Sequence, residues 1–136
     1  MTMNIRFPGN KKVAAEYNGF IINTDQPAAA GGDGSAPAPF DLFLASLGTC
    51  AGIYVLGFCQ QRGLDTAGIE LTQTMHFDTA KRMIGKIDID ISIPDTFPEK
   101  YRDALVNTAS LCAVKKHIQD PPEFAITTSV RQGGIA

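Results

Sequence analysis

The amino-acid sequence predicts an α+β protein with antiparallel sheets, organised as a single domain over residues 1–136. Its 136 residues match the length of one ordinary domain, and 44% of them are hydrophobic, which is enough to form a core. Segments with strand patterns occur in groups, before and after one long uncharged segment with helix signals. Such grouping favours antiparallel sheets around a central helix over a parallel sheet, in which strands and helices alternate.

The N-terminal region predicts three short strands, over residues 4–8, 12–18 and 20–24. Asn18-Gly19, between the last two, is a dipeptide typical of a tight β-hairpin. Residues 27–39 (PAAAGGDGSAPAP) then predict a loop rich in glycine, alanine and proline. A loop of this length inside a compact domain is either a flexible linker or a functional segment.

The central segment predicts a long helix that begins at Pro39 and ends at the polar residues before Gly63. Proline suits the first helical turn, where its missing N–H would have no partner, and Asp41 suits the positive end of the helix dipole. No residue from 42 to 59 is charged.

Two interpretations account for this uncharged helix. Its length just reaches that of a membrane span, but Gly48, Gly52 and Gly57 and the lack of flanking anchors argue against one. A helix buried on nearly all sides is the preferred interpretation. Because a chain this small needs a second subunit to surround such a helix, we expect a homodimer and no membrane partner.

The C-terminal half predicts two strands, two helices and a closing strand. Alternating apolar residues indicate half-buried antiparallel strands over residues 68–78 and 86–95. Pro98 opens a helical pattern, and a second short helix from Leu111 to Gln119 has Ser110 as its expected cap. Residues 123–131 (EFAITTSVR) complete the order as a strand.

Composition and spacing exclude several classes of function. The net charge is −2 and no basic run exceeds two residues, so a nucleic-acid partner is not expected. The three cysteines form no CxxC pair, and His76 lies far from all of them in the sequence, which disfavours a metal site. The N-terminus does not resemble a secretory signal, so we expect a reducing, cytoplasmic compartment in which the cysteines are free or redox-active thiols.

Helical geometry separates the three thiols. Cys50 and Cys59 would lie on opposite faces of one helix, about 13.5 Å apart along its axis, and cannot form a disulfide. A partner for Cys50 must therefore come from elsewhere in the chain, and Cys112 is the remaining thiol. Near the start of a helix, Cys112 would also lie where the helix dipole favours a thiolate. In the alternative interpretation all three cysteines are small buried apolar residues, and this suits Cys59 best.

Two segments carry a resemblance to a known family. APAPFDLFLASLGTCAGIYVLGF (residues 36–58) and ASLCAVKKHI (residues 109–118) resemble the OsmC/Ohr family, the osmotically inducible and organic hydroperoxide resistance proteins. The resemblance implies an intertwined homodimer with active sites at the interface between central helices. It also implies that Cys50 is a peroxidatic thiol that reduces organic hydroperoxides in oxidative stress defence. Cys112 would resolve the product as a disulfide that an external dithiol reduces, without metal or cofactor.

The sequence departs from the family pattern at the groups that activate the thiol. The peroxidases of the family have a carboxylate directly after the helix-opening proline, where this chain has Phe40, and Asp41 follows one residue later. They also use an arginine ahead of the helix, and Arg6 is the only arginine there. By the resemblance, Asp41 and Arg6 join Cys50 and Cys112 as the expected catalytic residues.

Two other functional hypotheses remain open. The same fold would serve as a binding module that holds a small apolar ligand at the dimer interface, without peroxidase activity. In a purely structural alternative, the cysteines only pack the interior, and Asp41 only caps its helix.

Overall fold

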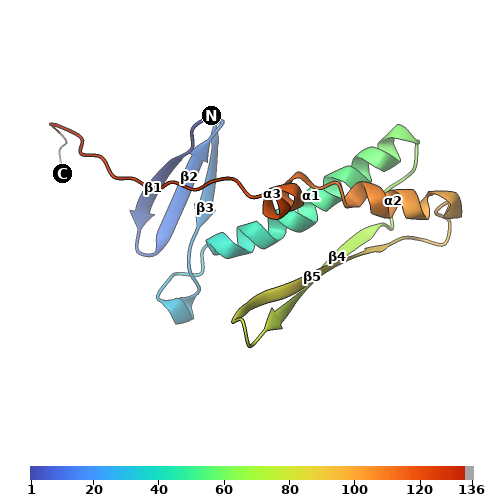
Figure 1. Cartoon of the computed structure of the whole chain (residues 1–136), viewed down its shortest axis with the longest axis horizontal. Coiled ribbons are helices and arrows are strands. Elements are labelled where there is room, and N and C mark those ends of the chain that lie inside the picture. Colours follow the sequence, from blue (N-terminus) through green and yellow to red (C-terminus); the bar gives the residue numbers. More distant parts are fainter. Residues whose placement is uncertain (134–136) are drawn as a thin grey trace.

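A computed structural model describes residues 1–133 and confirms the α+β class with antiparallel sheets. Figure 1 shows a small N-terminal sheet at one end and a long central helix beside a two-stranded sheet and two short helices. The elements are β1 (Asn4–Gly9), β2 (Lys12–Tyr17), β3 (Phe20–Thr24), α1 (Pro39–Gln61), β4 (Glu70–Asp78), β5 (Met83–Ser92), α2 (Arg102–Ala109) and α3 (Ala113–Gln119), with single 3-10 turns at Ala28–Ala30 and Glu99–Tyr101.

The three predicted N-terminal strands are confirmed as one antiparallel sheet in the order β1-β2-β3. Asn18 and Gly19 have φ angles of 50° and 78°, the left-handed conformation that a two-residue hairpin requires. Exposed apolar side chains cover much of this sheet, among them Phe7, Phe20 and Ile21. One chain therefore leaves this sheet without a core of its own.

The glycine-rich segment between β3 and α1 is a folded loop. The fully buried carboxylate of Asp25 accepts hydrogen bonds from the backbone N–H of Gln26 at 2.7 Å and from the N–H and hydroxyl of Ser35 at 3.0 and 2.6 Å. These donors, with the Ser35 hydroxyl first, hold the pKa of Asp25 far below its usual range. Asn10 and Lys12 bind Asp33 from the β1–β2 hairpin, so the loop is attached at two points.

The second sheet pairs β4 with β5 and packs its apolar face toward α1. Cross-strand neighbours on that face include Leu71 with Ile91 and Met75 with Ile87. Charged residues occupy the other face, where the Asp88 carboxylate contacts His76 at 2.7 Å and Lys86 at 3.1 Å. The alternating pattern predicted these two strands and their inward faces.

The core lies between the C-terminal half of α1, α2 and the loop before α2. Its buried residues are Val55, Phe58, Cys59, Phe97 and Leu105. The Arg62 guanidinium stacks over Phe58 at 3.6 Å from the ring centroid and donates to the Phe58 carbonyl oxygen at 3.2 Å. These contacts fix the end of α1, where the sequence predicted it.

Helix α1 is apolar on faces that the chain does not cover. Its most apolar window has a mean hydropathy of 1.9, and only 28% of that window is buried. By length and composition, α1 is the one helix of the described residues able to cross a membrane, a test that core helices of soluble proteins also pass. Ile53 remains 58% exposed beside Gly52, so the expected burial on nearly all sides is not reached within one chain.

Two local predictions in the C-terminal region were wrong. Residues 123–131 form no strand, because no strand within residues 1–133 pairs with them, and Figure 1 shows them as an irregular trace that runs from α3 past the N-terminal sheet. Ser110 does not cap α3: its hydroxyl donates to the Val106 carbonyl at 2.9 Å and ends α2. Cys112 is the residue at the N-cap of α3.

Candidate active site

The packing of α3 against α1 brings together two thiols that are distant in the sequence. Cys50 lies midway along α1 and is half-buried, whereas Cys112 lies at the N-cap of α3 and is buried. The two thiols lie close enough that each shifts the pKa of the other. Both cysteines are free thiols.

The surroundings of Cys50 favour its thiolate. The hydrogen bond from Cys112 and then the backbone N–H of Val114 lower the pKa of Cys50, with a smaller contribution from the Ala113 N–H. Burial opposes this effect without overcoming it. Cys50 thus receives donors from a side chain and from the first turn of α3.

The pKa of Cys112 shifts in the opposite direction to that of Cys50. Burial and then the hydrogen bond to Cys50 raise the pKa of the Cys112 thiol. Cys50 therefore loses its proton at a lower pH than Cys112; the interaction between the two thiols contributes to both shifts, and burial is the larger cause for Cys112. The positions of the two thiols therefore give them different pKa values, lowered for Cys50 and raised for Cys112.

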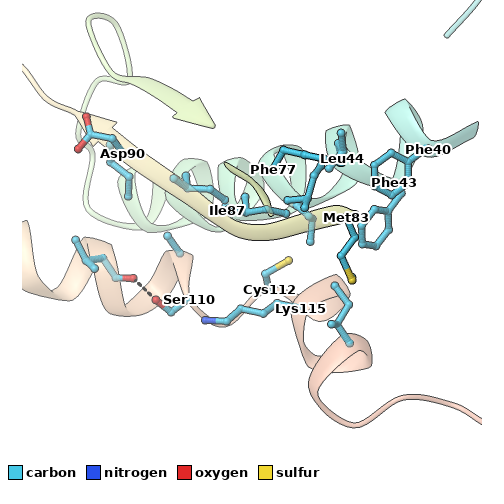
Figure 2. A pocket seen from close by; sticks show the side chains of 18 of the residues that line it. Phe40, Phe43, Leu44, Phe77, Met83, Ile87, Asp90, Ser110, Cys112 and Lys115 are labelled. Carbon is cyan, nitrogen blue, oxygen red and sulfur yellow. Dashed lines mark hydrogen bonds between the residues drawn. The ribbon is translucent and has the colours of Figure 1, made fainter. Parts of the chain in front are cut away.

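An apolar cavity of about 970 Å³ opens beside Cys112, between α1, β5 and the α2–α3 segment. Figure 2 shows Cys112 at its middle, with Phe40, Phe43 and Met83 toward one end; Phe77 also lines the cavity. The ring centroids of Phe40 and Phe43 lie 5.6 Å apart in a stacked pair. Ser110 and Lys115 also line the cavity.

The other two expected catalytic residues lie away from the thiol pair. The Asp41 carboxylate accepts a hydrogen bond from the Ala38 N–H at 3.1 Å and so serves the N-terminus of α1. Arg6 lies on β1, 3.9 Å from the carboxylate of Glu16, in the sheet that Figure 1 shows at the far end of the molecule. Neither contributes to the pKa of Cys50.

The third thiol belongs to the core. Cys59 is fully buried, and burial raises its pKa. A buried neutral thiol with no hydrogen-bonding donor nearby is unreactive, which agrees with the sequence-based interpretation of this residue.

Sequence reasoning missed the backbone groups that face Cys50. The donors from Ala113 and Val114 depend on where α3 begins, and the expected cap at Ser110 placed that start too early. Ala113, directly after Cys112, was the available signal, because an alanine there has an N–H to donate and a proline would not.

Two neighbouring thiols, one of which lines an apolar cavity, characterise this α+β protein as one with a dithiol site. The chain matches the family model for the OsmC-like protein over residues 32–127, and it belongs to that family. This confirms the family predicted from the two cysteine segments. The comparison with curated proteins gives no match.

Three solved structures share the fold. A protein from Psychrobacter arcticus, provisionally named an osmotic stress induced and detoxification response protein, is 25% identical over 85% of this chain and 86% of its own, with a TM-score of 0.70. An organic hydroperoxide resistance protein OsmC from Legionella pneumophila is 17% identical over 88% and 90% of the two chains, with a TM-score of 0.55. A provisionally named organic hydroperoxide resistance protein from Vibrio cholerae, with captopril bound in one of its active sites, is 15% identical over 89% and 86%, with a TM-score of 0.54.

Proposed function

We propose that the protein is a thiol-dependent peroxidase that reduces organic hydroperoxides through Cys50 and Cys112. The observation that carries this proposal is the pairing of two thiols that shift each other's pKa, one of which, Cys112, lines an apolar cavity. A low-pKa thiolate beside a second, protonated thiol is the arrangement that peroxide reduction followed by disulfide formation needs. The apolar wall favours an alkyl or aryl hydroperoxide over hydrogen peroxide, because burial of the organic group is favourable.

In the first step the Cys50 thiolate attacks the outer oxygen of the hydroperoxide. An S–O bond forms, the O–O bond breaks, and the departing alkoxide takes a proton from solvent water and leaves as an alcohol. Cys50 is then a sulfenic acid. The Cys112 thiol lies beside the reacting sulfur, where it donates a hydrogen bond until the thiolate has reacted.

In the second step Cys112 becomes the nucleophile. Its sulfur attacks the Cys50 sulfenic acid, the S–S bond forms, the S–O bond breaks, and the oxygen leaves as water. An external dithiol then reduces the disulfide by thiol–disulfide exchange and restores both thiols. Asp41 and Arg6 enter this scheme only as proposals: a second subunit would have to bring Arg6 to Cys50.

We propose further that the protein works as a homodimer in the cytoplasm. Helix α1 supports this assembly, because it combines a mean hydropathy of 1.9 with burial of only 28% of its most apolar window. The sheet β1-β2-β3 supports it too, since its large apolar side chains Phe7, Phe20 and Ile21 are exposed in the single chain. A second copy that covered both surfaces would place the thiol pair near the interface.

The proposal is tested by intact-mass analysis after one equivalent of cumene hydroperoxide. The wild-type protein should lose two hydrogens and resist iodoacetamide at Cys50 and Cys112. Cys112→Ser should instead stop at a sulfenic acid that dimedone traps, and Cys50→Ser should not react. Cys59→Ser is the matched control and should behave as wild type.

Unmodified wild-type protein after this treatment, or normal turnover by Cys50→Ser with dithiothreitol, would refute the peroxidase proposal. The apolar cavity of about 970 Å³ would then favour the binding-module hypothesis. A rise in melting temperature on addition of an apolar ligand, with no thiol oxidation, would be the result expected for such a module.

A further inference from the structure

We propose that Cys50 and Cys112 form a binding site for Cu(I), a soft monovalent metal ion that the two sulfur atoms hold between them. One ligand comes from the middle of α1 and the other from the N-cap of α3. The inference goes beyond the proposed peroxidase function and does not depend on it, because metal binding uses the two thiols without any peroxide chemistry.

The fold supplies two soft ligands that the sequence holds far apart. Cys50 and Cys112 are free thiols, and their side chains interact where α3 packs against α1. A metal that binds this pair does not have to order two distant segments of chain, because folding has already done so. Two thiols placed together in this way are a ready chelating group.

The pair is accessible to an ion. Cys50 is half-buried, and Cys112, although only 4% exposed, lines the apolar cavity of about 970 Å³. Leu47 and Ala51, which lie on either side of Cys50 along α1, line the same cavity. Figure 2 shows Cys112 in the middle of this lining. The cavity therefore gives an incoming ion a path to the sulfur atoms.

The ligand set is too small for zinc or for an iron–sulfur cluster. No group of three or more His, Cys, Asp or Glu side chains suited to a metal occurs within residues 1–133. Zinc sites use three or four protein ligands, and iron–sulfur clusters use four. Cu(I) prefers sulfur ligands and, as a closed-shell ion, is stable with only two of them in a linear arrangement. Two thiolates and no further ligand therefore select Cu(I).

The surroundings of the pair are also suited to a soft ion. Met83 lines the cavity and brings a thioether sulfur, whereas Asp90, the one acidic residue of the lining, has its carboxylate pointing away from Cys112 in Figure 2. Two thiolates around a monovalent cation carry a net charge of −1. Lys115 lines the same cavity and takes part in no salt bridge among residues 1–133, so its ammonium group is available to balance this charge.

Binding is a ligand exchange without a change of oxidation state. The thiols of Cys50 and Cys112 lose their protons to solvent water, two S–Cu bonds form, and the bonds between Cu(I) and its carrier break. With both sulfur atoms on the metal, neither is free to attack a peroxide. A disulfide between the same atoms has no thiolate to offer the ion. Metal binding and oxidation of the pair therefore exclude each other.

The test is the anaerobic transfer of Cu(I) from its coloured complex with bicinchoninate to the reduced full-length protein. The wild-type protein should take up one Cu(I) per chain. Cys50→Ser and Cys112→Ser should each weaken binding by at least about 100-fold, because even an outer-shell partner of a metal contributes roughly 10–100-fold. Cys59→Ala removes the third thiol, which lies in the core on the same helix as Cys50, and should bind as wild type does.

Two further measurements need no variant. Wild-type protein whose thiol pair has been oxidised with diamide, which takes up the two thiol hydrogens, should bind no Cu(I). In the reduced protein Cu(I) should protect Cys50 and Cys112 from iodoacetamide, whereas an excess of Zn(II) should protect neither.

Copper uptake that survives Cys50→Ser or Cys112→Ser, or equal protection by Zn(II), would overturn the inference. Peroxide turnover by a protein that takes up no Cu(I) would likewise overturn the inference and leave the proposed function standing. Uptake of Cu(I) by a protein that does not consume hydroperoxide would refute the proposed function and leave the metal site standing.

Discussion

At the scale of single residues, one hydrogen bond assigns different tasks to two chemically identical side chains. The bond from Cys112 is the first cause of the lowered pKa of Cys50, and the same bond adds to burial in raising the pKa of Cys112. As pH rises, Cys50 therefore loses its proton before Cys112 does. In the proposed mechanism, this difference in environment would distinguish the nucleophile from the resolving thiol before any peroxide binds.

Replacing Cys112 tests this division directly. Cys112→Ala removes the S–H donor, so the pKa of Cys50 should rise and its alkylation by iodoacetamide should slow at pH 7. Cys112→Ser keeps a hydroxyl donor at the same place and should leave the pKa of Cys50 near its wild-type value. The measurement is the alkylation rate of Cys50 against pH, followed by mass spectrometry. Identical pH profiles for the alanine and serine variants would contradict the assignment.

Ala113 allows a second test, of the backbone donors. Ala113→Pro removes one N–H that faces Cys50 while keeping the start of α3, because proline is favoured at the first helical position. The preceding residue, Cys112, already has φ −53° and ψ 126°, which a following proline accepts. The pKa of Cys50 should rise, but less than in Cys112→Ala, since the Ala113 donor is a smaller cause. Ala113→Ser keeps the N–H and should titrate as wild type; an equal rise in both variants would contradict the role of the amide.

The thiol pair was predictable from sequence, but the groups around it were not. Helical spacing excluded Cys59 as a partner of Cys50 and left Cys112, and the two thiols do meet. The expected carboxylate and cation did not follow, because Asp41 satisfies an N–H at the end of its own helix and Arg6 lies on a different sheet. A motif fixes which residues are present, whereas the contacts of a side chain depend on packing that a motif does not describe.

At the scale of elements, strand β4 is fastened to α1 by one polar side chain. Gln73 Nε2 donates to the Leu44 carbonyl of the helix at 2.9 Å, and Gln73 Oε1 is buried without a hydrogen-bond partner in the described residues. This oxygen would lie 2.8 Å from a Cβ added at Gly48. Glycine at position 48 therefore leaves space for the Gln73 side chain to reach the helix. The spacing of apolar residues along the helix did not predict this role.

The coupling between these two residues is measurable by a double-mutant cycle. Gly48→Ala should bring little or no stability in the wild-type background, because the gain in helix propensity is offset by displacement of Gln73 and loss of about 1 kcal/mol of hydrogen bonding. In a Gln73→Ala background the same change should raise the free energy of unfolding by about 0.5–1 kcal/mol, since the obstructing oxygen is gone. Urea unfolding of the four proteins gives the result. Equal effects of Gly48→Ala in both backgrounds would exclude the coupling.

At the scale of the whole molecule, residues 123–131 have the sequence pattern of a strand but pair with neither sheet in the described chain. The pattern of residues 123–131 predicts a strand, yet Phe124, Ile126 and Val130 are 82%, 98% and 92% exposed. The fold class was predictable because each element carries its own pattern. The structure of residues 123–131 was not predictable, because a strand forms only when another strand pairs with it. That pairing depends on the other segments or subunits present, which the pattern of the segment itself does not show.

The proposed homodimer accounts for this segment if a second copy provides its partner. Phe124, Ile126 and Val130 share one face of an extended chain, and Thr127 lies on the other. Ile126→Lys should therefore weaken the dimer by at least about tenfold, because burial of an isoleucine contributes roughly 1.5–3 kcal/mol. Thr127→Lys adds the same charge to the opposite face and should change the dimer little. Sedimentation equilibrium over a range of concentrations measures both dissociation constants. A wild-type dimer that tolerates Ile126→Lys as well as Thr127→Lys would show that this face stays in water, and the covering of α1 would then have to come from elsewhere in the second copy.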